Sequence, residues 1–415
     1  MSSERISATY RVETPLPVAQ AAEVLAGEQS SGTFVAVPGE TDELRTRFRA
    51  RIERITELES VATPSLPGSR GRGPFHRAQV VISWPLENVG CNLPTLVSTV
   101  AGNLYELSEF SGVKLMDLEV PESFGTMFPG PRFGIDGTRR LTGVHGRPMV
   151  GTIIKPSVGL SPGQTAGLVK VLAEAGIDFV KDDELMADPP HSPLDQRVDA
   201  VMRVIHEHAQ RTGKKVMYAF NVSDELDAML RHYDKVVAAG GTAVMVSLNS
   251  AGLAGVKKLC DQGAVPVHGH RNGWGMLNRH AMLGVDFCAY QKLWRLAGVD
   301  HIHVNGLANK FWEGDDSVVR SIEACRRPLL VSHRRRSAAG RTVHPAGGVI
   351  RTDRPAGAGD VSPHENHRPA VPGRRRDHGP PDGPGGGRGR HPPGVGGGGG
   401  RCAAGGLRRA APGTA

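Results

Sequence analysis

A cluster of charged residues, Lys181-Asp182-Asp183-Glu184, is the segment of this chain best suited to chemistry. It ends a strand-like run, and residues two apart on a strand share one face. Lys181 and Asp183 are therefore expected to point to the same place, which Glu184 can reach from the following turn. Two carboxylates that meet in an oxygen-lined site suit a hard cation such as Mg²⁺. A solvated strand end has the same composition, so the spacing alone leaves both interpretations open.

Polar residues of similar kinds recur between residues 155 and 303, each time at the end of a strand-like run. They are Lys155-Pro-Ser157, Asn221, His268-Gly-His270-Arg271 and His301-Ile-His303. A single histidine in such a place is more often a hydrogen-bonded core residue than a ligand. Several strand ends that carry lysines, carboxylates, histidines and an arginine favour one site built from all of them.

The elements that must position these residues repeat regularly from Met149 onward. Short β-rich runs predict strands at residues 150–154, 177–181, 216–220, 243–248, 265–268 and 301–304. Amphipathic stretches between them predict helices at residues 164–175, 224–239 and 279–297, the last broken near Gly284. Ser161-Pro162 gives the first helix a capping residue and a first-turn proline. This alternation is typical of parallel βα units.

The fold class that follows is α/β, with an N-terminal α+β domain and a TIM-type (β/α)8 barrel. Eight βα units need about 250 residues, so the barrel is expected to be truncated after about six. An open doubly wound sheet is the alternative, but the Gly-x-Gly-x-x-Gly turn expected after its first strand is missing. Frequent glycine and proline between residues 125 and 147 predict domains at residues 1–145 and 146–330.

The composition changes abruptly after Leu330. Residues 331–415 contain 15 Arg, no Lys, 5 acidic residues and no Phe, Trp or Tyr. The whole chain carries a net charge of +8, yet residues 1–330 hold 35 basic and 37 acidic side chains, so the basicity belongs to this tail. The tail offers too little apolar surface to offset the entropy of ordering, and disorder is expected. A frame-shifted segment is favoured over a genuine Arg/Gly-rich tail.

The bulk composition excludes several classes of protein. No apolar run approaches the roughly 20 residues that span a bilayer, and Met1-Ser-Ser-Glu-Arg5 lacks the basic-then-apolar order of a secretory signal. The five cysteines form no CxxC pair, which is typical of reduced, cytoplasmic thiols. We therefore expect a cytoplasmic protein without a membrane partner. A nucleic-acid-binding tail is the non-enzyme alternative, which the lack of interleaved aromatic residues disfavours.

Seven motifs, in the expected order over roughly residues 10–330, resemble the RuBisCO large-subunit superfamily. Those in the predicted barrel are Gly151-Thr-Ile-Ile-Lys-Pro156 with Gly159-Leu-Ser161, Phe179-Val-Lys-Asp-Asp-Glu184, Val267-His-Gly-His-Arg271, and Asp300-His-Ile-His303 followed by Lys310. Those near the N-terminus are Glu28-Gln-Ser-Ser-Gly-Thr33 and Gly102-Asn103. The N-terminal motifs resemble the segment that reaches into the barrel of a partner subunit.

The resemblance implies a metal centre. Mg²⁺ would be held by Lys181, as a carbamate formed with CO₂, together with Asp183 and Glu184. The ion would polarise a substrate carbonyl and stabilise an enediolate. The carbamate would act as general base, Lys155 would assist proton movement, and His270 would contact a substrate hydroxyl.

The resemblance also implies groups for a phosphorylated substrate. Arg271 and His303 would hold phosphate, and Lys310 would close over the reacting end. The residues that a partner subunit would contribute are Glu28, Thr33 and Asn103. A homodimer with shared active sites is therefore expected.

Departures from the carboxylating members narrow the implied activity. Ser157 stands where those members have a second lysine after Lys-Pro, and Asn272-Gly-Trp274 replaces a motif that ends in histidine. The bulky pair Phe311-Trp312 follows Lys310. These changes spare the metal centre and alter the groups that would handle CO₂ addition. The chain therefore resembles the RuBisCO-like, non-carboxylating branch, with ribulose-1,5-bisphosphate carboxylase/oxygenase as the alternative.

Members of that branch catalyse enolisation, isomerisation or decarboxylation of phosphorylated keto-sugar-like compounds, and the resemblance implies such a reaction here. The serine-glycine and double-glycine loops that bind phosphate in the family are not found after residue 330. The polypeptide is therefore expected to be unstable or inactive. Soluble expression with a cooperative melt and Mg²⁺-dependent turnover would contradict this prediction.

Overall fold

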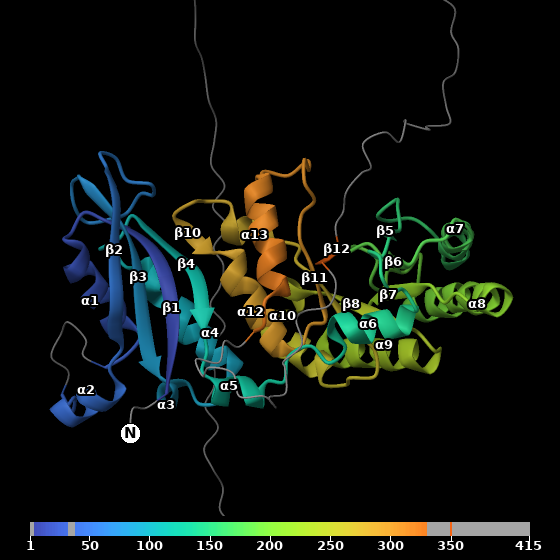
Figure 1. Ribbon diagram of the computed structural model, residues 1–415, viewed down its shortest axis with the longest axis horizontal. Coiled ribbons are helices and arrows are strands. Elements are labelled where there is room, and N and C mark those ends of the chain that lie inside the picture. The colour runs from blue at the N-terminus through green and yellow to red at the C-terminus, as the bar shows by residue number, and fades with distance from the viewer. Residues whose placement is uncertain (1–3, 32–37, 330–348, 351–415) are drawn as a thin grey trace, which may run out of the picture. The chain divides into compact units, whose positions relative to one another are not determined.

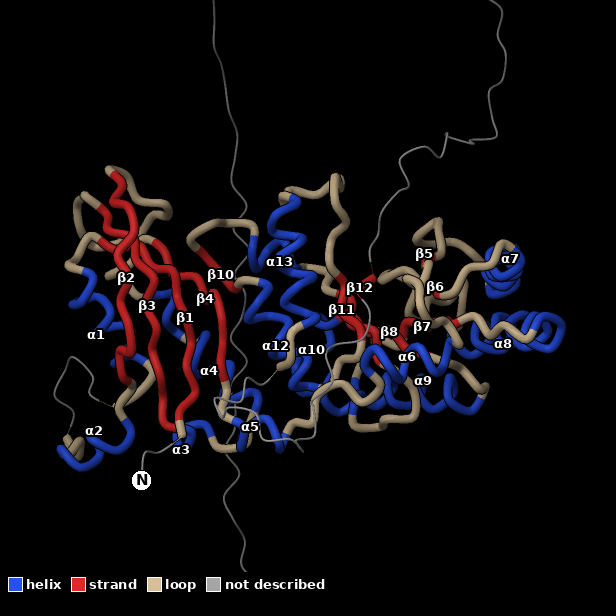
Figure 2. The backbone as a smooth tube through the Cα atoms, viewed as in Figure 1, coloured by secondary structure: helices blue, strands red, loops and turns tan. Residues whose placement is uncertain are grey.

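The computed structural model describes residues 4–31 and 38–329, together with the backbone of residues 349–350. Two sheets organise the described part of the chain (Figures 1 and 2). The first has five strands in the order β10-β4-β1-β3-β2, and the second has seven in the order β12-β11-β9-β8-β7-β6-β5.

The first sheet is largely antiparallel. Four of its strands are β1 (Arg5–Thr14), β2 (Arg51–Val61), β3 (Phe75–Pro85) and β4 (Gly112–Glu119). In β1 alternate side chains from Ile6 to Val12 are buried, because a strand turns successive side chains to opposite faces. The helices of this part are α1 (Val18–Glu28), α2 (Asp42–Phe48), α3 (Leu86–Val89), α4 (Leu93–Ala101), the short η1 (Asn103–Glu106), α5 (Glu122–Met127) and α6 (Gly134–Thr142).

The second sheet is parallel throughout. Its strands are β5 (Gly151–Ile153), β6 (Phe179–Lys181), β7 (Met217–Asn221), β8 (Ala243–Ser247), β9 (Val267–His270), β11 (His301–His303) and β12 (Val349–Ile350). Its connecting helices are α7 (Pro162–Glu174), α8 (Leu194–Thr212), α9 (Leu226–Ala238), α10 (Leu248–Cys260), α11 (Trp274–Asn278), α12 (Phe287–Ala297) and α13 (Asp315–Arg326). The six predicted strands correspond to β5 to β9 and β11.

The predicted fold class, an N-terminal α+β domain followed by a truncated TIM-type barrel, is confirmed. An N-terminal sheet domain precedes a curled parallel sheet that forms a half-barrel, consistent with a truncated TIM-type barrel (Figure 2). Val349 and Ile350 pair with Ile302 and His303, so a two-residue strand from the predicted tail extends the sheet. The prediction for the rest of residues 331–415 lies outside the described residues.

The predicted helix over residues 279–297 is wrong in its first part. Residues Leu283–Val285 form strand β10, which pairs in parallel with Val113–Leu115 of β4, and only Phe287–Ala297 is helical. Asp286 separates the two, because its carboxylate accepts a bond from the N–H of Cys288 and caps the helix. The break foreseen at Gly284 is thus a change of element.

The helix α7 begins as the sequence predicts. Ser161 accepts a bond from the N–H of Gln164, and the Gln164 side chain bonds back to the N–H of Ser161, which completes a capping box. In β7 and β8 every residue is buried, as expected of a parallel sheet covered on both faces. No helix in the described ranges is long and apolar enough to cross a membrane.

Candidate functional site

Lys181 is the last residue of β6, and its side chain is fully buried. Its Nζ lies 3.0 Å from the carbonyl oxygen of Asp182 and 3.5 Å from Sδ of Met245. Burial lowers the pKa of the Lys181 ammonium to about 8, although Glu184 and Asp183 oppose this effect. The amine is therefore easier to deprotonate than an exposed lysine.

Asp183 lies beside Lys155, which extends from the end of β5. Lys155 Nζ is 2.5 Å from Oδ2 of Asp183 and 2.8 Å from Oγ of Ser157. Burial acts to raise the pKa of Asp183, but the bond and charge of Lys155, together with bonds from the Leu185 N–H and from Ser157, outweigh it, and the pKa falls below its ordinary value. The Asp183 carboxylate is thus charged, buried and partnered by an exposed lysine.

Glu184 connects this cluster to the end of β9. Its Oε2 lies 3.6 Å from Nε2 of His270. The side-chain amide of Asn221, at the end of β7, donates to the carbonyl oxygens of Asp183 and Glu184, each at 3.1 Å. Asn221 therefore fixes the backbone that carries both predicted metal-binding carboxylates.

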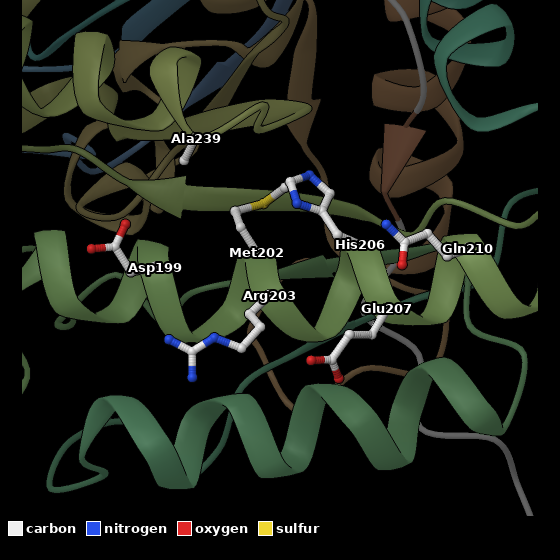
Figure 3. Close-up of a pocket in the computed structure, with 7 residues that line it drawn as sticks. All are labelled: Asp199, Met202, Arg203, His206, Glu207, Gln210 and Ala239. Atoms are coloured by element: carbon white, nitrogen blue, oxygen red, sulfur yellow. The ribbon is translucent and has the colours of Figure 1, made fainter.

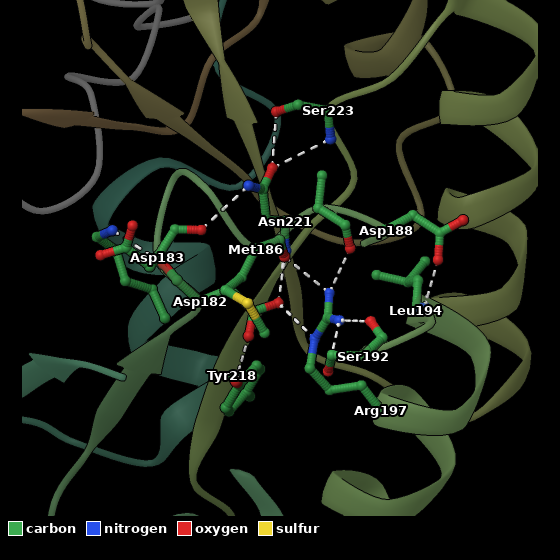
Figure 4. Close-up of polar contacts among 12 residues, drawn as sticks. Asp182, Asp183, Met186, Asp188, Ser192, Leu194, Arg197, Tyr218, Asn221 and Ser223 are labelled. Atoms are coloured by element: carbon green, nitrogen blue, oxygen red, sulfur yellow. Dashed lines mark hydrogen bonds and ion pairs between the residues drawn. The ribbon is translucent and has the colours of Figure 1, made fainter. Parts of the chain in front are cut away.

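A buried ion pair supports the same segment from below (Figure 4). Arg197, on α8, lies 3.2 Å from Oδ2 of Asp182, and both side chains are almost inaccessible to solvent. The guanidinium also donates to the carbonyl oxygens of Met186, Ala187 and Ser192. Asp182 therefore faces away from the predicted ligands and anchors the loop that follows them.

Four histidines line the ends of β9 and β11. Ring centroids are 4.8 Å apart for His270 and His303, 5.6 Å for His268 and His303, and 5.9 Å for His268 and His301. Burial lowers the pKa of His270 to about 3 and of His301 to about 4, and it holds those of His268 and His303 well below the ordinary value. These rings are therefore neutral near pH 7. Among the described residues, Nε2 of His303 and both nitrogens of His268 have no hydrogen-bond partner.

Arg271 follows β9 and is buried. Its Nη2 lies 3.3 Å from Oε2 of Glu313, and its guanidinium carbon lies 5.4 Å and 5.1 Å from the ring centroids of Trp274 and Phe287. Burial lowers the pKa of Arg271, but a guanidinium remains charged at any ordinary pH. Nη1 has no partner in the described part of the chain.

Lys310 is the predicted site residue that stands apart in the barrel domain. It is exposed, and its Nζ lies 5.4 Å from the ring centroid of Phe311. No hydrogen bond or ion pair joins it to the other predicted residues within the described ranges. The structure therefore gathers Lys155, Lys181, Asp183, Glu184 and His270 in one neighbourhood and leaves Lys310 at its edge.

The N-terminal site residues are placed only in part. Glu28 ends α1 and Asn103 begins η1, and these two elements contact one another. Thr33 lies outside the described residues. Within the described part of the chain, neither Glu28 nor Asn103 bonds to the cluster at Lys181, so their predicted role would have to be played in another subunit.

Sequence reasoning missed Arg197 and Glu313. Arg197 lies in the apolar stripe of α8, among Leu194, Val198 and Val201, which are all buried. An arginine at such a position is a detectable signal, because a buried guanidinium needs several acceptors. Glu313 gives no comparable signal, since its partner Arg271 is far away in the sequence.

Two further features lie away from the predicted site. A surface hollow of about 440 Å³ runs along α8 (Figure 3), lined by Asp199, Met202, Arg203, His206, Glu207, Gln210 and Ala239. A second group of potential metal ligands consists of Asp188, Asp224 and His232, whose ligand atoms lie within 4.8 Å of one another. Neither feature contains a residue predicted to act on substrate.

Known proteins similar to this chain agree in architecture. Residues 134–340 match the catalytic domain of the ribulose bisphosphate carboxylase large chain, and residues 2–124 match its N-terminal domain. A 3-oxo-isoapionate-4-phosphate transcarboxylase/hydrolase from Xanthobacter autotrophicus is 54% identical over 327 residues, which cover 79% of each chain. A 3-oxo-isoapionate-4-phosphate decarboxylase from Rhizobium etli is 47% identical over 326 residues, or 78% of each.

A solved structure gives the same result. The crystal structure of a rubisco-like protein from Burkholderia fungorum superposes with a TM-score of 0.76 at 46% identity, covering 84% of this chain and 81% of that one. The two domain matches, the relatives near 50% identity and the shared fold lead to one conclusion: this chain belongs to the ribulose bisphosphate carboxylase large chain family, alongside enzymes and rubisco-like proteins.

Proposed function

We propose that this chain is a Mg²⁺-dependent enzyme that forms an enediolate from a phosphorylated keto-acid of the 3-oxo-isoapionate 4-phosphate type. The observation that carries the proposal is the placement of buried Lys181 near the charges of Asp183 and Glu184, with Lys155 bonded to Asp183. Two relatives near 50% identity are named for reactions on that compound, one a decarboxylase and the other a transcarboxylase/hydrolase.

The residues at the end of β6 fit a hard cation. Asp183 and Glu184 offer carboxylate oxygens, the ligand type that Mg²⁺ prefers. The Lys181 amine is buried, 3.0 Å from the carbonyl oxygen of Asp182 and 3.5 Å from Met245 Sδ, and burial favours its neutral form. A neutral amine can combine with CO₂, and the resulting carbamate would supply a third anionic oxygen. When bound there, Mg²⁺ would supply Lewis acidity towards a substrate carbonyl.

The residues of the chain divide the remaining tasks. Loss of CO₂ from a 3-oxo acid leaves an electron pair on the adjacent carbon, as an enolate that must then take up a proton. Lys155 would deliver or remove that proton. Its side chain is exposed at the end of β5, and its Nζ donates a hydrogen bond to Ser157. His270, neutral and 3.6 Å from Glu184, can accept a hydrogen bond from a substrate hydroxyl.

The charged end of the substrate would lie towards β9 and β11. Arg271 Nη1 and His303 Nε2 are buried polar atoms without partners in the described part of the chain. Leaving such atoms unpaired costs free energy, which a bound phosphate would recover through charge-assisted hydrogen bonds. Glu28, Thr33 and Asn103 would complete the site from a second copy in a homodimer.

The direct test is release of CO₂ from 3-oxo-isoapionate 4-phosphate by the full chain. The missing glycine loops predict an inactive chain. The proposal predicts instead turnover after incubation with Mg²⁺ and bicarbonate, and its loss when EDTA removes the metal, because the cluster at Lys181 is assembled in the described residues. Absence of turnover from a chain that melts cooperatively would contradict the proposal. Incubation with ribulose 1,5-bisphosphate and labelled CO₂ tests the carboxylase alternative, for which we expect no fixed label because Ser157 and Trp274 stand where carboxylating members have a lysine and a histidine.

A further inference from the structure

Glu313 is a buried carboxylate to which the proposed function gives no task. Its side chain is about 1% exposed, and it precedes α13 directly. A buried carboxylate is costly unless hydrogen bonds and an opposite charge compensate it. Its partners therefore indicate what it holds in place.

Both oxygens of Glu313 are used. Oε2 accepts from Nη2 of Arg271 at 3.3 Å and from Nδ2 of Asn305 at 2.7 Å. Oε1 accepts from the hydroxyl of Ser317 at 2.8 Å. Three elements meet at this carboxylate: the end of β9, the start of the segment after β11, and the first turns of α13.

The segment from Asn305 to Glu313 carries Lys310. Glu313 fixes both of its ends, because it lies at one end and binds Asn305 at the other. A bond within the segment adds to this closure, since Nδ2 of Asn309 donates to the carbonyl oxygen of Gly306 at 2.7 Å. The carboxylate of Glu313 therefore joins the two ends of this segment to each other and to Arg271.

The guanidinium of Arg271 is held in a defined orientation. Trp274 and Phe287 pack against it, and Glu313 takes Nη2, while Nη1 stays without a partner in the described ranges. A planar guanidinium held on one side presents its remaining donors in a fixed direction. Such a group is prepared for an anion.

We propose that Glu313 is a positioning residue, which aims Nη1 of Arg271 at a phosphate and couples that guanidinium to the segment carrying Lys310. The inference rests on the proposed function, because it takes Arg271 as a phosphate-binding group. It adds the residue that determines the orientation of the phosphate-binding guanidinium. A simple counter-ion would act differently, since its negative charge would only weaken anion binding.

Two substitutions separate positioning from charge. Glu313→Gln keeps an acceptor for Arg271 and Asn305 and can donate to Ser317, but it removes the charge. Glu313→Ala removes the acceptor and the charge. Positioning predicts that Glu313→Ala weakens binding about tenfold, whereas Glu313→Gln binds as tightly as the parent or more tightly.

The measurement is titration calorimetry of the full chain with inorganic phosphate, with thermal melts to show that each variant is folded. Glu323→Ala is the matched control, because it removes an exposed carboxylate from the neighbouring helix α13, and among the described residues Glu323 forms an ion pair only with Arg327. It should leave phosphate binding unchanged. If Glu313→Ala does not fold, Asn305→Ala removes a partner of the same carboxylate, and about threefold weaker binding is expected.

The outcomes are distinct. Equal or tighter phosphate binding by a folded Glu313→Ala would overturn the inference. So would an equal loss in Glu313→Gln, because the retained acceptors for Arg271 and Asn305 would then have no effect on phosphate binding. No phosphate binding by the parent would also overturn it. Failure of the proposed reaction is seen separately, as missing Mg²⁺-dependent CO₂ release from a chain whose phosphate binding still responds to Glu313.

Discussion

The two ends of the candidate site are built from opposite chemistry. At β5 and β6 the functional groups are two lysines and two carboxylates, and Lys155 is bonded to Asp183. At β9 and β11 they are neutral histidines and one arginine, whose only ion-pair partner among the described residues is Glu313. The first end offers anionic oxygens and the second offers N–H donors.

Under the proposed function, this difference would separate a cation-binding region from an anion-binding region within the barrel domain. A phosphorylated keto-acid has both requirements, because its carbonyl must be polarised at one end and its phosphate held at the other. The two regions meet at His270 and Glu184, which are 3.6 Å apart. If the division is correct, a substitution in one region should weaken the binding of its own ion and leave the binding of the other ion unchanged.

The largest effect is expected from Lys181→Met. This change keeps much of the side-chain volume but removes the amine that would become the third anionic ligand. We expect CO₂ release to fall on the order of a thousandfold, while phosphate binding is retained. Lys235→Met is the matched control, because within the described ranges the side chain of Lys235 forms an ion pair only with Asp199, at the surface. A Lys181→Met variant with parental turnover would remove Lys181 from the mechanism.

Arg197→Met should damage the fold beneath the cation-binding region. The change leaves the Asp182 carboxylate buried without its counter-ion and several carbonyl groups without their donor. We expect a loss of about 3 to 5 kcal/mol in the free energy of unfolding, measured by urea denaturation. Arg211→Met, also on α8, removes an exposed pair with Glu174 and should cost less than about 1 kcal/mol. Similar losses in both variants would show that the buried pair has no special weight.

Local patterns in the sequence were enough to predict the parallel strands and the residues at their ends. Strand periodicity placed Lys181 at the end of β6, and the capping signal at Ser161 placed the start of α7. These features depend on residues close together in the chain. The motifs added the family, because they fix both the order and the chemistry of the strand ends.

Interactions between distant residues could not be predicted in this way. Residues 283–285 were predicted to be helical because nothing close to them in the sequence indicates a strand partner. That partner is Val113–Leu115 of β4, which precedes β10 by 170 residues. The pair Arg271–Glu313 spans 42 residues and depends on how α13 packs. Arg197 is an intermediate case, because its place in the apolar stripe of α8 marks it as buried without naming its partner.

His301→Gln should change how stability depends on pH in the histidine-rich region. His301 is fully buried and its pKa is about 4, below the ordinary value of about 6.5. Below pH 6.5 the unfolded chain therefore binds a proton that the folded chain does not, so stability falls as the pH falls. Glutamine removes this effect and can still bond to Thr138. Between pH 7 and pH 5 the variant should lose about 2 kcal/mol less than the parent in urea denaturation. An equal loss would show that folded His301 takes up the proton.

Arg271→Met and Glu184→Gln test the division of the site directly. The first removes an anion-binding donor and should weaken inorganic phosphate binding about tenfold, with Mg²⁺ binding unchanged. The second removes a carboxylate charge, so it should weaken Mg²⁺ binding and leave inorganic phosphate binding unchanged. Because His270 joins the two regions, the double variant should deviate slightly from additivity, by about 0.5 kcal/mol. Calorimetry with each ion measures all four affinities. A large coupling free energy would contradict the division, because it would show that both regions contribute to the binding of each ion.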